Sequence, residues 1–388
     1  MKKKRIAILG STGSIGQNAL DVIRRHRDRI DVVLLSAQNN VESLAAQVRE
    51  FSPKMVAISQ QKVPVLKELL GKGLRIYNTE QDLSELVTHP SVDLVLIAMS
   101  GAAALSPFLS AVKAGKVVAP ANKEALVIAG EIIMRTARKS GARIVPVDSE
   151  QSAIFQCLLG QRRESLRRIV LTASGGSFRD LSREELTGVT VEQALAHPNW
   201  SMGNKLTVDS ATMMNKGFEV IEAQRLFALA AHQVAVVVHP EAIVHSLVEF
   251  CDGSMIAQMG PTDMRVPIQY ALTYPQRWEQ PDRHLDLEKM TPLRFFAPDL
   301  KRFPLLGLAF EAARKGGTLP AVMNAAYEVA VGAFLDGRIP FLSIARSVMT
   351  VVRKHRKKNR PSVGDILEAD RWAREQTRTV LKGASCLF

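Results

Sequence analysis

The sequence predicts an α/β protein with three parts: an amino-terminal doubly wound parallel sheet, a central α+β domain and a carboxy-terminal helical domain. Short β-branched runs alternate with helical stretches up to about residue 150, which is typical of a parallel sheet covered by helices. Almost no strand pattern occurs after residue 305. At roughly 100–200 residues per domain, the 388 residues suffice for two or three domains.

The strands of the first domain are expected where apolar and β-branched residues cluster. These runs are Arg5–Leu9, Val32–Leu35, Met55–Ile58, Leu94–Met99, Val117–Ala119 and Arg143–Val147. A helix from about Gln17 to His26 follows the first run. Residues 94–112 carry no charge, but Gly101 and Pro107 interrupt them, so we expect a strand, a turn and a helix here rather than a membrane span.

The composition changes twice more along the chain. Strands are expected at Ile169–Leu171, Val234–Val238 and Ser254–Gln258, and a proline-rich connector follows them. We therefore predict domains at residues 1–147, 148–280 and 305–388, with the connector at residues 281–304.

The charge balance is strongly basic, with 51 Lys and Arg against 38 Asp and Glu and a net charge of +13. Residues 301–388 alone hold 16 basic against seven acidic side chains, which we interpret mainly as a solvated helical face. A nucleic-acid-binding protein would interleave aromatic residues with such charges. Aromatic residues make up only 5% of the chain, and the basic run Arg353–Arg360 contains none, so we expect neither a nucleic acid nor a membrane as partner.

Three cysteines are too few for a disulfide framework or a zinc cluster, which favours a reducing, cytoplasmic location. The basic start of the chain is followed by only four apolar residues, Ile6–Leu9, so we expect no secretory signal.

A glycine-rich turn, Gly10-Ser-Thr-Gly-Ser-Ile-Gly16, lies between the first strand and the first helix. Glycines let backbone N–H groups approach a pyrophosphate, and the helix N-terminus adds partial positive charge. The spacing is GxxGxxG, so a plain strand-to-helix turn is the alternative interpretation. No acidic residue occurs in Ser36–Asn40, where an NAD site usually has one, and this favours NADP, although no basic residue is present there either.

Two carboxylates, Asp148 and Glu150, follow the strand expected at Arg143–Val147. If the backbone is extended, both point to one side and suit Mg²⁺ or Mn²⁺. The alternative is a helix start, with Asp148 or Ser149 as the N-cap. A third carboxylate would strengthen the metal hypothesis, and Glu219 is the candidate.

Glu219 ends a segment of unusual polar density that begins at His197. Asn215, Lys216 and Glu219 would share one side of a helix's first turn, where two donors and a carboxylate suit a phosphate and a metal. Trp200 lies in a loop bounded by proline and glycine, which favours a loop that closes over a substrate.

Six motifs in order resemble the 1-deoxy-D-xylulose 5-phosphate reductoisomerase family over nearly the whole chain. They are the glycine turn, Ala121-Asn-Lys-Glu-Ala125, Val147-Asp-Ser-Glu150, Thr172-Ala-Ser-Gly-Gly176, His197–Glu219, and His239-Pro-Glu with His245-Ser. The resemblance implies a Rossmann-type NADPH-binding domain and a homodimer. It also implies an NADPH- and metal-dependent rearrangement and reduction of 1-deoxy-D-xylulose 5-phosphate to 2-C-methyl-D-erythritol 4-phosphate in non-mevalonate isoprenoid biosynthesis.

The resemblance also implies roles for individual residues. NADPH would be bound by Thr12, Gly13, Ser14, Ile15, Asn40, Asn122, Glu124 and Gly203. One divalent ion, Mg²⁺ or Mn²⁺ with Co²⁺ as a further option, would be held by Asp148, Glu150 and Glu219. The substrate would contact Lys123, Ser149, Glu150, Ser174, His197, Ser210, Asn215, Lys216 and Glu219. Catalytic residues would be Lys123, Glu150, His197, Trp200 and His245. The pair Gln38-Asn39 lacks the basic residue that some members have near the 2′-phosphate.

Three other functions remain as alternatives. A simple NAD(P)-dependent dehydrogenase would leave the three carboxylates and the Asn215-Lys216 pair without a role. A nucleic-acid-binding protein lacks the aromatic residues named above. An NADP-sensing scaffold would tolerate the loss of Glu219.

Overall fold

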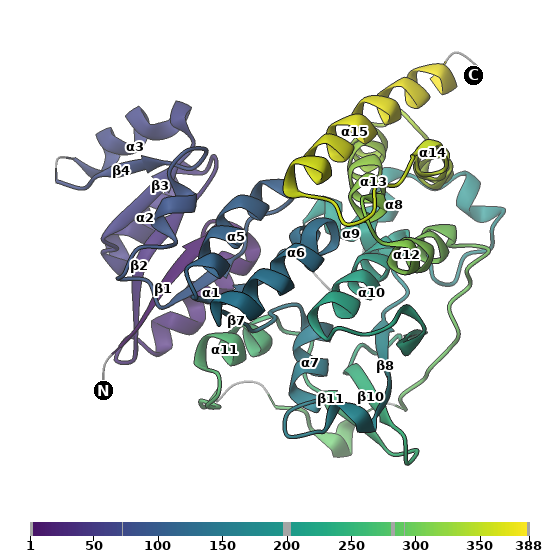
Figure 1. The fold of residues 1–388 in the computed structure, drawn as a ribbon, viewed down its shortest axis with the longest axis horizontal. Coiled ribbons are helices and arrows are strands. Elements are labelled where there is room, and N and C mark those ends of the chain that lie inside the picture. Colours follow the sequence, from purple (N-terminus) through teal and green to yellow (C-terminus); the bar gives the residue numbers. More distant parts are fainter. Residues whose placement is uncertain (1–2, 72, 197–202, 281–283, 291, 386–388) are drawn as a thin grey trace. The chain divides into compact units, whose positions relative to one another are not determined.

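The computed structural model describes residues 3–71, 73–196, 203–280, 284–290 and 292–385. The chain divides into two compact units (Figure 1). Unit 1 comprises Met1–Ala125, Ile133–Phe155 and Asp263–His284, and unit 2 comprises Leu126–Ile132, Gln156–Thr262 and Leu285–Phe388. The three-domain boundaries expected from the sequence stay a prediction.

Unit 1 contains a seven-stranded sheet with the order β4-β3-β2-β1-β5-β6-β7, and all of its pairings are parallel. The prediction of a doubly wound parallel sheet is thus confirmed. Its strands are β1 (Lys4–Leu9), β2 (Ile30–Ser36), β3 (Met55–Ile58), β4 (Ile76–Asn78), β5 (Leu94–Ile97), β6 (Val117–Pro120) and β7 (Arg143–Ile144). Strand β4 was not predicted, because three residues at a sheet edge give too short a pattern.

Helices alternate with these strands. They are α1 (Ser14–Arg25), α2 (Val41–Phe51), α3 (Val63–Leu70), α4 (Leu83–Leu86), α5 (Leu105–Lys113), α6 (Glu124–Ser140) and α7 (Ser149–Cys157). The uncharged stretch forms β5, a turn and α5, as predicted. No helix in the described part of the chain is long and apolar enough to cross a membrane.

Helix α11 (Arg265–Thr273) belongs to unit 1, although the strands of that unit are far from this helix in the sequence. Its apolar residues Ile268, Ala271 and Leu272 are buried in the same core as the strands of the sheet. The ring of Trp278, just after the helix, meets His26 edge-on with centroids 4.9 Å apart. The hydrophobic face of α11 therefore determines where this segment packs.

Unit 2 contains a four-stranded sheet with the order β11-β10-β8-β9. Its strands are β8 (Leu166–Ala173), β9 (Val234–Val238), β10 (Val244–Phe250) and β11 (Met255–Met259). Strands β8 and β9 are parallel and the other two pairings are antiparallel. The central strand β10 was not predicted, because His245, Ser246 and Glu249 interrupt its apolar pattern, yet all three are buried.

The helices of unit 2 are α8 (Val191–Leu195), α9 (Asn204–Ala211), α10 (Met214–Leu226), α12 (Pro304–Lys315), α13 (Leu319–Leu335), α14 (Phe341–Lys354) and α15 (Val363–Ser385). Helix α10 packs against β8 and β9. As predicted, the carboxy-terminal part of the chain, from α12 to α15, is helical. Gly217 lets α10 and α12 approach closely, because a Cβ atom there would lie 2.7 Å from Cβ of Ala309.

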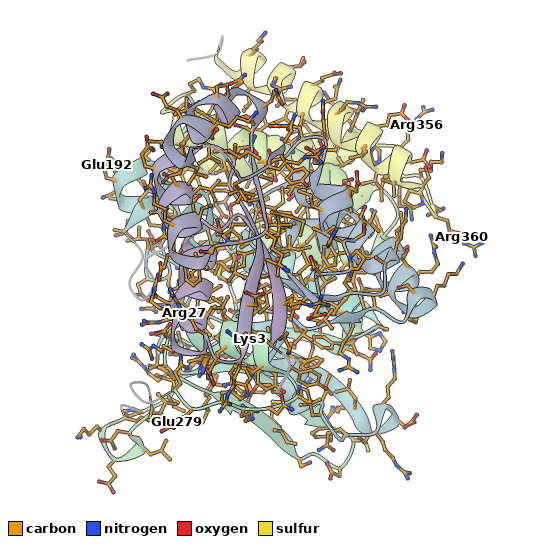
Figure 2. All side chains as sticks on the ribbon, turned by 90° about the vertical axis from the view of Figure 1, so that its left-hand side faces the viewer. Lys3, Arg27, Glu192, Glu279, Arg356 and Arg360 are labelled. Carbon is orange, nitrogen blue, oxygen red and sulfur yellow. The ribbon has the colours of Figure 1, made fainter. Side chains whose placement is uncertain are left out.

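The positive charge of residues 301–388 was interpreted mainly as a helical face, but most of the run Arg353–Arg360 lies outside helices. Helix α14 ends at Lys354, and the following residues form a loop. The exposed side chains of Arg356 and Arg360 extend outward from this loop (Figure 2). Pro361 disfavours helix in the last residues of this loop, because its ring excludes the helical conformation just before it.

The turn between β1 and α1 generates a prediction about stability. A Cβ atom on Gly16 would lie 2.4 Å from the carbonyl oxygen of Gly10, whereas one on Gly13 would have no neighbour closer than 3.5 Å. We expect Gly16→Ala to lower the free energy of unfolding by about 2 kcal/mol or more, and Gly13→Ala to change it little. Urea denaturation of the two variants measures both values, and equal losses would contradict this account of the turn.

Candidate active site

The glycine turn forms a compact cradle at the carboxyl end of β1. Gly10 has φ +85°, and a Cβ atom there would lie 2.7 Å from the carbonyl oxygen of Ala98, so only glycine fits. Two hydrogen bonds connect the turn to Gln47 of α2. Ser11 Oγ donates to Gln47 Oε1 at 2.6 Å, and Gln47 Nε2 donates to Ser11 O at 3.0 Å.

The outer side of this turn remains accessible. Gly13 and Ser14 are exposed, and Thr12 and Ile15 are half-buried. Gly13 is the N-cap of α1 with no side-chain cap, and the helix has no acidic residue in its first turn. Such a helix N-terminus, with unblocked N–H groups, suits the pyrophosphate of a dinucleotide.

The ends of the neighbouring strands are organised by amide side chains. Asn40 Oδ1 accepts from the backbone N–H of Ser43 at 3.0 Å and caps α2. Asn122 donates to the carbonyl of Met99 at 2.8 Å and accepts from the N–H of Ala125 at 2.9 Å. Asn122 thereby fixes the start of α6, where Glu124 is the first residue.

An acidic side chain that the sequence reasoning missed lies beside the end of β2. Gln38 Nε2 donates to Glu80 Oε1 at 3.1 Å, and the backbone N–H of Gln60 donates to Glu80 Oε2 at 3.3 Å. The absence of an acid from Ser36–Asn40 is therefore a weaker argument for NADP than it was in the sequence, because tertiary structure brings Glu80 to this position.

Asp148 and Glu150 lie at the start of α7, which begins at Ser149. The helix-start interpretation is correct, and the extended one is wrong. Lys123 Nζ lies 2.6 Å from Asp148 Oδ2, and Ser149 Oγ donates to Glu150 Oε2 at 2.5 Å. A helix start and a ligand set are compatible here, because each carboxylate oxygen has two lone pairs and can accept more than one contact.

Asn215, Lys216 and Glu219 lie on one side of α10 near its start, as their spacing predicted. Asn215 Nδ2 donates to Glu219 Oε1 at 2.7 Å, and Lys216 Nζ pairs with Glu219 Oε2. Glu219 is fully buried and Lys216 is 3% exposed. An ionised carboxylate is costly to bury, and these two donors supply the compensation.

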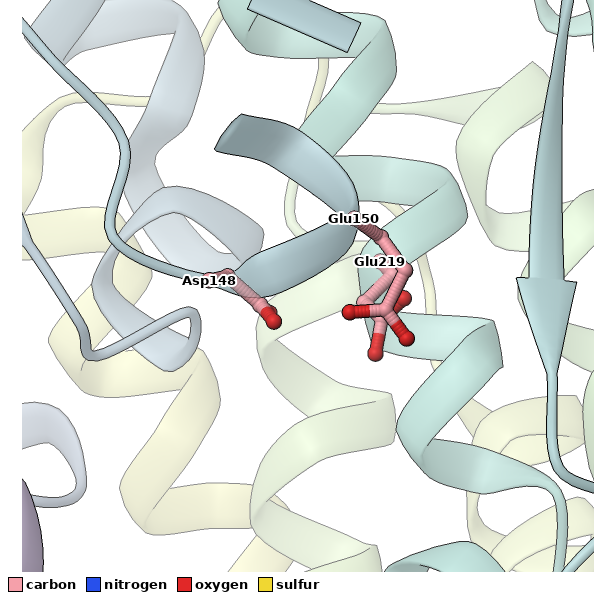
Figure 3. A group of neighbouring side chains, drawn as sticks. All are labelled: Asp148, Glu150 and Glu219. Carbon is pink, nitrogen blue, oxygen red and sulfur yellow. The ribbon is translucent and has the colours of Figure 1, made fainter. Parts of the chain in front are cut away.

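The three carboxylates named as metal ligands form one group: a carboxylate oxygen of each of Asp148, Glu150 and Glu219 lies within 4.8 Å of the others (Figure 3). Three hard oxygen donors at this spacing fit a divalent cation such as Mg²⁺. Lys123 and Lys216 pair with two of the three carboxylates. Positive charge from both lysines thus offsets part of the negative charge of the group.

A glycine pair after β8 brings Ser174 toward α9. Gly176 has φ +73°, and a Cβ atom there would lie 2.4 Å from the carbonyl oxygen of Ser210. The N–H of Gly176 donates to Ser174 Oγ at 3.3 Å. The backbone at Gly176 therefore contacts the end of α9, where Ser210 lies, and this contact requires glycine.

The connection from α9 to α10 contacts Tyr327 of α13, a residue that sequence reasoning missed. Met213 has φ +59°, an uncommon conformation for a side chain of this kind. Thr212 Oγ1, just before it, lies 2.7 Å from the hydroxyl of Tyr327 on α13. Burial raises the pKa of Tyr327 well above its usual value, and the nearby Asp209 carboxylate raises this pKa further. A lone tyrosine in a strongly apolar helix was the available signal, since a buried hydroxyl needs a partner.

His239 and His245, the histidines of the two motifs near β10, differ in their surroundings. His239 is fully buried, and its Nε2 accepts from the N–H of Val244 at 3.1 Å while Nδ1 lies 2.9 Å from the carbonyl oxygen of Arg294. It therefore holds two loops together. His245 lies on β10, is 9% exposed and remains a predicted catalytic residue.

His197 and Trp200 lie outside the described residues, so their roles stay sequence predictions. Gly203 is the exposed N-cap of α9 and has no side-chain cap.

The hydroxyl of Tyr327 provides a test of the α9–α10 connection. Tyr327→Phe removes its hydrogen bonds to Thr212 and Asp209, so we expect a loss of about 1–3 kcal/mol of unfolding free energy. Tyr270→Phe is the matched control, since no hydrogen bond to its hydroxyl is formed within the described residues. Chemical denaturation compares the two, and the same small effect in both would refute a structural role for the Tyr327 hydroxyl.

Comparison with known proteins gives a consistent result along the chain. Residues 6–130 match the family model described as 1-deoxy-D-xylulose 5-phosphate reductoisomerase. Residues 144–227 match its C-terminal domain, and residues 259–376 match the DXP reductoisomerase C-terminal domain.

Relatives of known name and structure match over nearly their full length. A reductoisomerase of Chlorobium chlorochromatii is 50% identical, covering 97% of this chain and 100% of the relative. One of Heliobacterium modesticaldum is 52% identical, covering 96% of each chain. The Zymomonas mobilis enzyme, solved in complex with NADPH, has a TM-score of 0.92 at 41% identity, covering 98% of this chain and 99% of the other.

A second solved structure, a DOX-P reductoisomerase in complex with NADPH, fosmidomycin and magnesium, has a TM-score of 0.91 at 40% identity and covers 98% of each chain. Identity of this extent over the full length, together with three matching family models, establishes the relationship. The chain belongs to the 1-deoxy-D-xylulose 5-phosphate reductoisomerase family.

Proposed function

We propose that this chain converts 1-deoxy-D-xylulose 5-phosphate into 2-C-methyl-D-erythritol 4-phosphate, with NADPH as reductant and a divalent metal ion as cofactor. The reaction belongs to non-mevalonate isoprenoid biosynthesis. The observation that carries the proposal is the group of Asp148, Glu150 and Glu219 in a chain that is 50% identical to a reductoisomerase over its whole length.

The residues present fit both cofactors. The three carboxylates supply hard oxygen ligands, which Mg²⁺ prefers, and the cradle at Gly10–Gly16 leaves helix N–H groups accessible for a pyrophosphate. When bound, the metal ion supplies Lewis-acid polarisation of substrate oxygens, and NADPH supplies the hydride.

The side chains around the carboxylates orient the substrate. Lys123 lies beside Asp148 and offers an ammonium group to a substrate oxygen on which negative charge develops during the rearrangement. Ser149, at the start of α7, presents a hydroxyl to the carbon backbone of the sugar. Side chains at these positions suit the rearrangement of the carbon skeleton, which precedes the reduction.

The substrate phosphate would be held by residues of unit 2. Ser174, Ser210, Asn215 and Lys216 offer two hydroxyls, an amide and an ammonium group. Gly176 brings the turn after Ser174 against the end of α9, so these donors come from adjoining segments. Phosphate binding away from the reacting bonds supplies energy for orientation of the substrate. His197, Trp200 and His245 complete the proposed catalytic set.

The central test is an assay that follows NADPH oxidation at about 340 nm with the full chain, 1-deoxy-D-xylulose 5-phosphate and Mg²⁺. We expect a metal-dependent decrease in absorbance, with the branched polyol phosphate as product by mass spectrometry, because hydride transfer consumes the reduced nicotinamide. Folded protein that consumes no NADPH under these conditions would exclude the proposed reaction. The ratio of NADPH to NADH affinity, measured by fluorescence titration, tests the cofactor separately.

Glu219→Gln tests the metal site independently of turnover. The amide retains the shape of the side chain but loses the negative charge, so we expect Mn²⁺ affinity to fall about 100-fold or more while NADPH affinity stays unchanged. Glu249→Gln is the matched control, because Glu249 is also a buried carboxylate but pairs with Arg167 and Arg168 on the sheet of unit 2. Calorimetric titration with Mn²⁺ should separate the two variants, and equal affinities would show that Glu219 is not a ligand.

Three finer features are also part of the proposal: use of Mn²⁺ in place of Mg²⁺, a cytoplasmic location and a homodimer. Support for the homodimer comes from β11, the edge strand of the unit 2 sheet, where Met255 is 49% and Ile256 38% exposed. Apolar side chains on an unpaired edge favour pairing with another chain. Sedimentation equilibrium should give twice the mass of the chain, and Ile256→Lys should shift the population toward monomer; a monomeric wild type would exclude the dimer.

A further inference from the structure

A cavity of about 260 Å³ lies in unit 2, between the segment that leads into α12 and the first turns of α14. Both helices are labelled in Figure 1. No residue with a proposed role in the reductoisomerase reaction lines it. Its size is close to the lower end of the range for small-molecule sites. It therefore needs an explanation apart from the reaction.

The floor of the cavity is apolar and firmly packed. Phe303, Leu305 and Phe341 are each no more than 5% exposed. The ring of Phe341 meets the rings of Phe178 and Phe334 edge-on, with centroids 4.9 and 5.7 Å apart. Such packing fixes the shape of the floor before any ligand arrives, so little ordering is required on binding.

One face of α14 forms the apolar wall. Leu342, Ala345 and Met349 line the cavity at positions i, i+3 and i+7, which places them on one side of the helix. All three are half-buried, so apolar surface is presented to the space. A hydrocarbon chain is the kind of group that gains free energy by covering this surface.

The rim of the cavity is cationic. Arg183, Lys301, Arg302 and Arg346 line it, and no acidic side chain does. Arg183 and Arg346 are exposed and form no ion pair with any described residue. Two guanidinium groups of this kind are suited to bidentate contacts with phosphate oxygens.

Arg302 is tied to the protein. Arg302 Nη1 donates to the carbonyl of Leu181 at 2.5 Å, and its guanidinium lies 5.0 Å from the ring centroid of Phe303. Asp299, which does not line the cavity, lies 3.7 Å from Nε of Arg302 and accepts from the backbone N–H of Lys301 at 3.0 Å. Arg183 and Arg346, together with the exposed ammonium group of Lys301, are thus the cations available to a ligand.

We propose that this cavity binds a small amphipathic anion, namely a phosphate group that carries a single alkyl or prenyl chain. The chain lies along Leu342, Ala345 and Met349, and the phosphate contacts Arg183 and Arg346. Neither half of such a ligand suffices alone, because a bare phosphate leaves the apolar wall in water and a bare hydrocarbon leaves the cations without a counter-charge. The proposal is independent of the reductoisomerase reaction.

The test is calorimetric titration of the full chain with n-octyl phosphate, in the presence of saturating 1-deoxy-D-xylulose 5-phosphate so that the substrate site is occupied. We expect saturable binding of n-octyl phosphate and none of n-octanol or inorganic phosphate at the same concentrations. The double variant Arg183→Gln/Arg346→Gln should weaken binding at least about tenfold, which corresponds to about 1.4 kcal/mol. Arg378→Gln, an exposed cation on α15, is the matched control and should bind like the wild type.

A second variant, Ala345→Trp, fills the cavity without changing charge and should abolish binding, while its thermal unfolding confirms that it folds. Absence of binding to the wild type overturns the proposal. Wild-type affinity in both the arginine double variant and Ala345→Trp does the same, because the ligand then binds elsewhere. Sedimentation with phosphatidic acid vesicles separates a membrane source from a soluble one, since association with vesicles without affinity for n-octyl phosphate would assign the cations to a surface rather than to this cavity.

Discussion

The burial of Glu219 is the constraint on which much of unit 2 depends. A carboxylate that is fully shielded from water must receive hydrogen bonds and a positive charge, and Asn215 and Lys216 supply them from the same side of α10. Those partners are useful only if α10 begins at the correct residue. The left-handed Met213 and the hydrogen bond between Thr212 and Tyr327 determine that start. Glu219 is thus both a buried charge that the start of α10 must stabilise and a member of the group of three carboxylates.

Two glycines allow the backbone to approach a neighbouring segment closely. Gly10 and Gly176 occur where a side chain would collide with a carbonyl oxygen of a neighbouring segment. At the first, the close approach leaves the N-terminus of α1 free for a pyrophosphate; at the second, it brings Ser174 toward the end of α9. In both places the function follows from the absence of a Cβ atom, and the surrounding core keeps the turn in its conformation.

Much of the fold was predictable because its signals are local. The parallel sheet followed from alternating strand and helix patterns, and the position of Asn215, Lys216 and Glu219 on one side of a helix followed from spacing alone. Strand β10 escaped prediction because buried polar residues break its pattern, and only pairing with β8 and β11 stabilises them. Helix α11 was assigned with the central segment because its partner, the core of unit 1, is far away in the sequence.

By itself the sequence determined the class of fold, the identity of the six motifs and the three carboxylates, since each depends on residue type and short spacing. Only the tertiary structure decided that Asp148 and Glu150 start a helix, that Glu80 lies beside Gln38, and that Tyr327 supports the connection before α10. Packing free energy depends on which distant surfaces meet, and a linear pattern carries no record of those partners. The cationic, apolar cavity between α12 and α14 belongs to the second group for the same reason: its lining comes from four separate stretches of the chain.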